Sequence, residues 1–189
     1  MSARMVVGIS GASGAIFGIR ALEILRDCGW ETHLVVSRAA IRTIGEETGR
    51  TLREVRQLAS FTYNVSDVGA AIASGSFVTE GMLIAPCSVK SAAEIAYGTT
   101  SNLLTRAADV VLKERRRLVV LFRECPLHVG HLRMLTLLAE AGAIVAPPVP
   151  AFYMQPKSIE ALVEQIVGRA LDLFGIRLPS MQRWEGRQS

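Results

Sequence analysis

The sequence is poor in the features that mark several large classes of protein. Its three cysteines, Cys28, Cys87 and Cys125, are too widely spaced for a disulfide framework or a metal-binding knuckle. No apolar run approaches the roughly 18 residues of a membrane span, because prolines interrupt the most apolar late stretch, residues 143–152. Internal repeats and low-complexity linkers are also absent. A chain of this length therefore predicts one domain over residues 1–189, with no membrane association.

Charge is also sparse. Only 20% of the residues are charged and 50% are hydrophobic, which predicts a protein that covers apolar surface by self-association. The net charge is +4, but the 18 arginines are scattered, and their one run, Arg115-Arg116-Arg117, is expected to be the solvated end of a helix. We therefore predict no nucleic-acid partner. A strand starts almost at the first residue and leaves no room for a signal peptide, so a cytoplasmic protein is expected.

The first strand and the turn after it dominate the pattern. Residues 5–9 form a short apolar run typical of a buried parallel strand, and Gly11-Ala12-Ser13-Gly14 follows. Apolar residues then recur at the 3.6-residue spacing of a helix that packs on a sheet. Small residues at a helix N-terminus leave N–H groups free for an anion, and Ser13 adds a hydroxyl. The glycine spacing matches neither the G-x-G-x-x-G fingerprint nor a Walker A loop, so a phosphate site and a plain tight turn both remain open.

Two further strand ends carry polar residues that suit an anionic ligand. Residues 32–36 end at Ser37-Arg38, where NAD-binding folds place an acidic residue for the ribose hydroxyls. Arg38 disfavours NAD, leaves NADP open and suits a ligand with a single phosphate. Residues 81–86 end in a second polar turn, and Ser88 opens the next helix. Capping alone would explain Ser88, but two such turns at the carboxyl edge of one parallel sheet favour a ligand site.

The second half of the chain adds charged residues to this pattern. A helix over residues 102–117 presents Arg106 and Lys113 on one face, and the strand that follows it ends at Arg123-Glu124. That charged pair is either a structural ion pair or a phosphate ligand beside a proton-transfer group.

Two histidines raise the question of a metal. His128 and His131 stand three residues apart in a helix predicted over residues 127–142, but no third ligand follows at a useful spacing. We therefore predict no metal site. A closing helix over residues 159–174 carries Arg169 among apolar neighbours.

Taken in this order, the motifs resemble the flavin prenyltransferases, the family of the ubiquinone-pathway enzyme and of the small B subunits of phenolic-acid decarboxylase systems. The resemblance covers nearly the whole chain, and the B-subunit branch is the most similar in residues 31–35 and 174–179. The motifs on which the resemblance rests are Gly11-Ala12-Ser13-Gly14, Val36-Ser37-Arg38, Ser74-Gly75-Ser76, Ala85-Pro86-Cys87-Ser88, Arg106-Ala107-Ala108-Asp109 through Lys113-Glu114, Arg123-Glu124, Pro147 to Tyr153 and Arg183-Trp184.

The resemblance implies an α/β fold, a Rossmann-like (flavodoxin-like) three-layer sandwich with a parallel sheet, assembled as a dodecamer. Such proteins join a dimethylallyl group from dimethylallyl phosphate to N5 and C6 of reduced FMN. The product, prenylated FMN, serves a separate decarboxylase of aromatic acids. Common diphosphate prenyltransferases hold Mg²⁺ with Asp-rich clusters, whereas the four aspartates of this chain are far apart in the sequence. A metal-independent enzyme that takes a monophosphate is expected, although a diphosphate donor remains open.

The family's functional residues carry over to the positions of this sequence that match its motifs. FMN would be held by Gly11, Ala12, Ser13, Ser37, Ser88, Val89, Lys90, Ser91 and Arg123. Dimethylallyl phosphate would be bound by Arg106, Lys113, Tyr153 and Arg169, partly across a subunit interface. The catalytic residues would be Ser13, Glu47, Lys113 and Glu124, with both glutamates shaping the phosphate site and assisting proton movement.

Two departures and two alternatives qualify this assignment. Cys125 replaces the usual Thr, Met or Ala, and Arg133 replaces a common Glu, which leaves local packing or subunit contact open.

A flavin-dependent decarboxylase of peptidyl or pantothenoyl cysteine would need a His base and an Asn-x-x-Met motif. His33 lies inside a predicted strand, and residues 102–105 lack the Met. A non-catalytic FMN carrier would not need residues such as Lys113.

Overall fold

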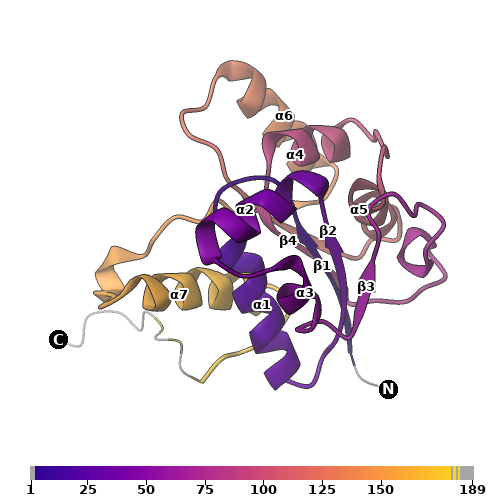
Figure 1. Cartoon of the computed structure of the whole chain (residues 1–189). Helices are drawn as coiled ribbons and strands as arrows, with labels where there is room; N and C mark the ends of the chain where they lie inside the picture. Colours follow the sequence, from indigo (N-terminus) through magenta and orange to yellow (C-terminus); the bar gives the residue numbers. More distant parts are fainter. Residues whose placement is uncertain (1–2, 180, 182, 184–189) are drawn as a thin grey trace.

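The computed structural model describes residues 3–179, 181 and 183, and its centre is a parallel sheet of six strands (Figure 1). The strands are β1 (Arg4–Ile9), β2 (Glu31–Val36), β3 (Phe61–Tyr63), β4 (Gly81–Cys87), β5 (Arg117–Phe122) and β6 (Ile144–Val145). They lie in the order β3-β2-β1-β4-β5-β6. The order reverses between β1 and β4, which is where open α/β sheets bind their ligands. The predicted Rossmann-like sandwich is confirmed.

Helices cover both faces of this sheet. They are α1 (Ala15–Asp27), α2 (Arg38–Thr48), α3 (Leu52–Arg56), α4 (Val89–Ala96), α5 (Leu103–Lys113), α6 (Val129–Glu140) and α7 (Ile159–Asp172), with short 3₁₀ turns η1 (Ala71–Ala73) and η2 (Phe152–Met154). Figure 1 shows α7 beside α1 on one face and α6 beside α4 on the other. In the described part of the chain, no helix combines the length and hydrophobicity of a membrane span.

Alternation along the strands builds two cores. In β1, Met5, Val7 and Ile9 pack with α1 and α7, whereas Val6 packs on the side of α4 and α5. Successive side chains of a strand point to opposite faces, so a central strand covered on both faces needs apolar residues at every position. This explains why β1 is a continuous apolar run rather than an alternating one.

The arginine run differs from the prediction. Helix α5 ends at Lys113, and the chain then turns through Arg115, which has a positive φ of 57°. Arg116 donates hydrogen bonds of 2.7 Å to the carbonyl oxygens of Gly75 and Phe77, and its side chain is only 16% exposed. The prediction that this residue belongs to a solvated helix end is therefore wrong for Arg116. Its guanidinium group is instead held by two backbone carbonyl groups of the loop between η1 and β4.

The sequence does not predict strand β3, because residues 61–63 show no clear alternation of apolar and polar residues. In the structure, Phe61 of this strand is 51% exposed. Its neighbour in β2, His33, is 2% exposed and stacks on the rings of Phe61 and Tyr63. His33 Nε2 donates to Glu31 at 3.0 Å, and Nδ1 accepts from the Tyr63 hydroxyl at 3.0 Å. Both ring nitrogens are thus satisfied in the neutral imidazole.

Helix α1 approaches β4 closely at one glycine. A β-carbon on Gly18 would clash with the carbonyl oxygen of Ala85 and with the side chain of Ile9. Gly45, in the middle of α2, has no neighbouring atom within 4 Å of the position where its β-carbon would lie. Only the first of these two helical glycines is required by packing.

We predict opposite effects for the two alanine substitutions. Gly18→Ala should lower the free energy of unfolding by about 1–3 kcal/mol, since α1 must move away from the sheet. Gly45→Ala should raise it by about 0.5–1 kcal/mol, because alanine loses less conformational entropy in a helix. Urea titrations of both variants and the wild type, at one protein concentration, measure the difference. Equal stability of Gly18→Ala and the wild type would contradict the close approach.

The buried histidine predicts a pH dependence. Burial lowers the pKa of His33 below its ordinary value, although the hydrogen bond to Glu31 opposes this shift. The unfolded chain therefore binds more protons than the folded one as the pH falls through about 6.5, and stability should decrease there.

We expect His33→Gln to remove that part of the pH dependence. Urea unfolding at about pH 7.5 and about pH 5.5 gives the change in the free energy of unfolding between the two pH values for the wild type and for the variant. The value at the higher pH is the reference, because there His33 is neutral in the folded and in the unfolded state. An identical loss of stability in both proteins would mean that other groups cause it.

Candidate functional site

The carboxyl ends of four strands are held together by short hydrogen bonds. The Ser10 hydroxyl, fully buried after β1, donates to the carbonyl oxygen of Pro86 at 2.9 Å and accepts from the backbone N–H of Ser88 at 2.7 Å. The backbone N–H of Ser37 donates to Ile9, and that of Arg123 donates to Cys87. The loops after β2, β1, β4 and β5 therefore form one continuous edge.

Two helices begin at this edge with serine caps. The Ser37 hydroxyl accepts from the N–H of Ala40 at 3.2 Å, and the Ser88 hydroxyl accepts from the N–H of Ser91 at 3.3 Å. Capping of α4 by Ser88 is thus observed. It does not exclude ligand binding, since the first N–H groups of a helix have no partner within the helix and can still meet an anion.

The N-terminus of α1 is occupied differently. Glu47, near the end of α2, accepts hydrogen bonds from the N–H groups of Gly14 at 2.8 Å and Ala15 at 3.0 Å. Gly11 allows α2 to lie against this turn, because a β-carbon there would clash with Ala39. Glu47 therefore fixes the turn that presents Ser13 rather than standing in the wall of the cavity described next.

A cavity of about 770 Å³ opens along the edge, within the size range of small-ligand sites. Its wall contains all nine residues that the family resemblance assigns to FMN, together with the predicted catalytic residue Glu124. The complete lining is Gly11, Ala12, Ser13, Ser37, Arg38, Ala39, Val65, Ser66, Ser88, Val89, Lys90, Ser91, Glu94, Ser101, Asn102, Arg123 and Glu124. The residues are brought together as predicted, and their individual roles remain predictions.

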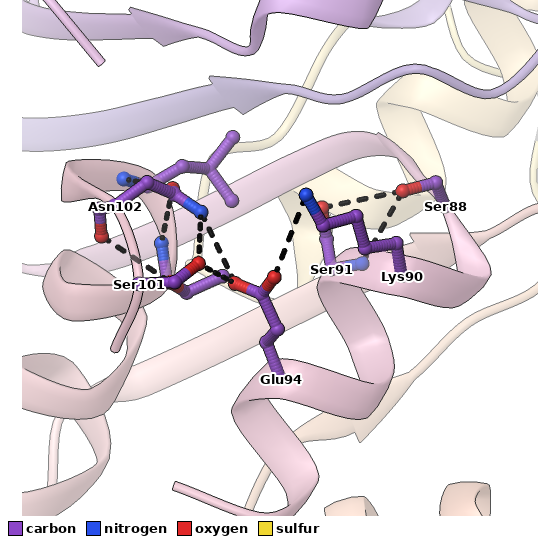
Figure 2. A network of polar contacts seen from close by, with 8 residues as sticks. Ser88, Lys90, Ser91, Glu94, Ser101 and Asn102 are labelled. Atoms are coloured by element: carbon purple, nitrogen blue, oxygen red, sulfur yellow. Dashed lines mark hydrogen bonds and ion pairs between the residues drawn. The ribbon is translucent and has the colours of Figure 1, made fainter. Parts of the chain in front are cut away.

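Sequence reasoning missed a polar network at one end of the cavity (Figure 2). Glu94 accepts from the Ser101 hydroxyl at 2.7 Å and from the Asn102 amide at 3.1 Å, and it lies 3.7 Å from the Lys90 ammonium. The Asn102 oxygen in turn caps α5 by accepting from the N–H groups of Leu104 and Thr105. Glu94 thereby joins α4, which borders the cavity, to α5. The one signal of this network in the sequence is Asn102, which stands where the helical pattern of α5 begins.

Neither Cys87 nor His33 is suited to catalysis at this cavity. Burial raises the pKa of the Cys87 thiol to about 12, so it stays protonated. His33 does not line the cavity; it lies in β2, and its ring stacks on side chains of β3. The structure therefore gives no support to a His33 base. Glu124 does reach the wall, and it accepts from the N–H of Cys125 at 3.0 Å.

The four residues assigned to dimethylallyl phosphate do not line this cavity in the described chain. Arg106 is paired with Asp109 at 2.7 Å, and Lys113 is paired with Glu114. Arg169 has a 71% exposed side chain and lies 3.6 Å from Asp172. Tyr153 lines a second cavity, of about 840 Å³, beside the start of α7. The four residues do not line one common cavity in the described chain, so their convergence remains a prediction that involves other subunits.

The C-terminal motif is described only in part. Arg183 forms two hydrogen bonds to Asp172, at 2.7 and 2.9 Å, and also borders the second cavity. Trp184 lies outside the described residues.

Comparison with known proteins agrees with this geometry. The flavoprotein family model matches residues 1–171. A probable UbiX-like flavin prenyltransferase of Bacillus subtilis (strain 168) is 57% identical over 183 residues, which cover 97% of this chain and 90% of the relative.

Two solved structures are similar over the whole fold. The crystal structure of AnUbiX (PadA1) in complex with FMN and dimethylallyl pyrophosphate has a TM-score of 0.98 and 47% identity, and each chain is covered to 100%. A dodecameric FMN-dependent UbiX-like decarboxylase from Escherichia coli O157:H7 has a TM-score of 0.95 and 45% identity, covering 97% of this chain and 100% of that one. The family predicted from the sequence is confirmed: the chain belongs to the flavoprotein family and, within it, to the UbiX-type flavin prenyltransferases.

Proposed function

We propose that this protein joins a dimethylallyl group to N5 and C6 of reduced FMN and releases prenylated FMN. The observation that carries the proposal is the cavity at the switch point of the sheet, whose wall gathers the predicted FMN residues from four strand ends. The similarity to a structure that contains FMN and dimethylallyl pyrophosphate supports the same pair of ligands.

The donor groups of the wall fit FMN. Hydroxyl groups of Ser13, Ser37 and Ser88 line it, and Arg123 adds a guanidinium group. A phosphate accepts hydrogen bonds from such groups, and a ribityl chain both donates and accepts. Bound reduced FMN would supply the reacting ring atoms and a flat π surface for the allylic group. The chain's own residues then have to hold the prenyl phosphate and move protons.

The leaving phosphate needs basic groups, and we assign them to Arg106, Lys113 and Arg169. Each has a carboxylate partner within its own chain. We infer that neighbouring subunits bring these groups, with Tyr153, to the cavity. In support, large apolar side chains are exposed on α6, in η2 and at the start of α7: Val129 61%, Leu132 52%, Phe152 71% and Ile159 74%.

These apolar surfaces support a dodecamer like that of the Escherichia coli O157:H7 neighbour. Arg133, one of the two departures from the family pattern, is exposed on α6 among them, so its effect would fall on a subunit contact.

Proton movement is assigned to Glu124 and Ser13, which both reach the cavity, with Glu47 fixing the turn that holds Ser13. A carboxylate within hydrogen-bond reach of the reacting atoms is a suitable general base. The product would pass to a separate decarboxylase of aromatic acids, and the expected compartment is the cytoplasm.

One incubation tests the activity. The protein is mixed anaerobically with reduced FMN and either dimethylallyl phosphate or dimethylallyl pyrophosphate, and the flavin is analysed by mass spectrometry. A flavin heavier by one dimethylallyl unit is expected. FMN that binds but stays unmodified with both donors would instead indicate a carrier.

Substitution of the basic residues should slow transfer without releasing the flavin. Lys113→Ala and Arg169→Ala should each reduce prenylation per bound flavin by about ten- to a hundredfold, since a charged contact to phosphate contributes about 1.5–3 kcal/mol. Flavin titration and single-turnover rates separate the two effects. Arg42→Ala, which removes an exposed pair with Glu46 on α2, is the control. Loss of FMN with normal prenylation per bound flavin would show that these residues are structural.

A further inference from the structure

The charges in the wall of the first cavity are unequally matched. Three cationic side chains line it, Arg38, Lys90 and Arg123, along with the carboxylates of Glu94 and Glu124. Lys90 is held by Glu94 at 3.7 Å. Within residues 3–179, 181 and 183, no side-chain hydrogen bond or ion pair involves Arg38 or Arg123. In this part of the chain, the cavity therefore holds two guanidinium groups that form no ion pair.

The two free arginines stand at different places along the edge. Arg38 follows β2 and Arg123 follows β5, with β1 and β4 between those strands. Three strand spacings amount to about 14 Å. Both side chains would have to extend fully toward the middle of the sheet to meet on one phosphate. They are better placed to bind separate parts of what the cavity holds.

The surroundings of Arg38 identify its ligand group as the phosphate of the flavin. The N-terminus of α1 is not available to that phosphate, because Glu47 already accepts from Gly14 and Ala15. Lys90 is paired with Glu94, and Arg123 is followed directly in the chain by Glu124, which also lines the wall. Among the described wall residues, Arg38 has no acidic residue next to it in the chain and no ion-pair partner, so its charge is left for an anionic ligand. The basic residues assigned to the prenyl phosphate lie on α5 and α7, outside this wall.

We propose that Arg38 binds the phosphate of FMN and makes the cavity select FMN over riboflavin, which has the same ring and ribityl chain but no phosphate. The inference rests on the proposed function and assigns a specificity residue to its site. A guanidinium group can make two parallel hydrogen bonds to phosphate oxygens. The Ser37 hydroxyl, next in the chain, accepts from the N–H of Ala40 and can still donate its own proton to a phosphate oxygen. Arg38 would add a positive charge beside this neutral donor.

The test combines two flavins with four proteins. Dissociation constants of oxidised FMN and of riboflavin are measured by titration for the wild type, Arg38→Ala, Arg38→Lys and Arg42→Ala, which is on the same helix but belongs to a surface ion pair. In Arg38→Ala the preference for FMN should fall by about tenfold to a hundredfold, while riboflavin affinity stays the same. Arg38→Lys keeps the charge, so its preference for FMN should lie between those of the wild type and Arg38→Ala. Arg42→Ala should have the same preference as the wild type. Added salt should weaken FMN binding less in Arg38→Ala than in the wild type.

Three results would overturn the assignment. An unchanged FMN preference in Arg38→Ala would mean that the phosphate lies elsewhere, and an equal loss of both flavins would mean that Arg38 only supports the fold of the loop. A raised KM for dimethylallyl phosphate at saturating FMN, with the flavin preference intact, would place Arg38 at the second substrate. A wild-type protein that binds neither flavin would overturn the proposed function together with this inference, whereas the other outcomes leave the proposed function standing.

Discussion

The site depends on one buried hydroxyl group. Ser10 leaves β1 and bonds to both Pro86 and Ser88 at the end of β4, the two strands between which the sheet order reverses. Helices on opposite faces diverge at this point, and nothing in a parallel sheet itself closes the gap between the loops. A buried polar group that has both its donor and its acceptor role filled orders its surroundings strongly. The positions of the α1 turn and of the α4 cap are thereby coupled.

Sequence reasoning succeeded where local chemistry repeats at each strand end. Ser37 and Ser88 follow apolar runs and precede helical patterns, so their place at the carboxyl edge follows from the rule that parallel strands point the same way. Arg123 and Glu124 could be placed by the same rule. The alternation of strand and helix indicated a parallel sheet, because buried parallel strands and their crossover helices have distinct periodicities. The three-layer sandwich itself was implied by the family resemblance.

The failures share a different cause, which is contact between residues far apart in the sequence. Arg116 is partly buried because the carbonyl groups of Gly75 and Phe77 need a donor, and no local pattern shows that need. Glu94 reads as an ordinary surface residue of a helix until Ser101 and Asn102 fold back onto it. Lys113 and Arg169 lie on different helices and do not line the cavity in the described chain, so the fold of one subunit does not test the site proposed for them.

The edges of the sheet have a consequence for how such chains associate. The outermost strands are very short, three residues in β3 and two in β6. Short edges offer few unpaired backbone groups, so strand-to-strand addition between molecules is disfavoured. Any contact between copies would then use side chains on helices and loops rather than strand pairing. A substitution on the exposed side of a helix, such as one at Arg133 on α6, would change such a contact and leave the sheet and the cavity along its carboxyl edge as they are.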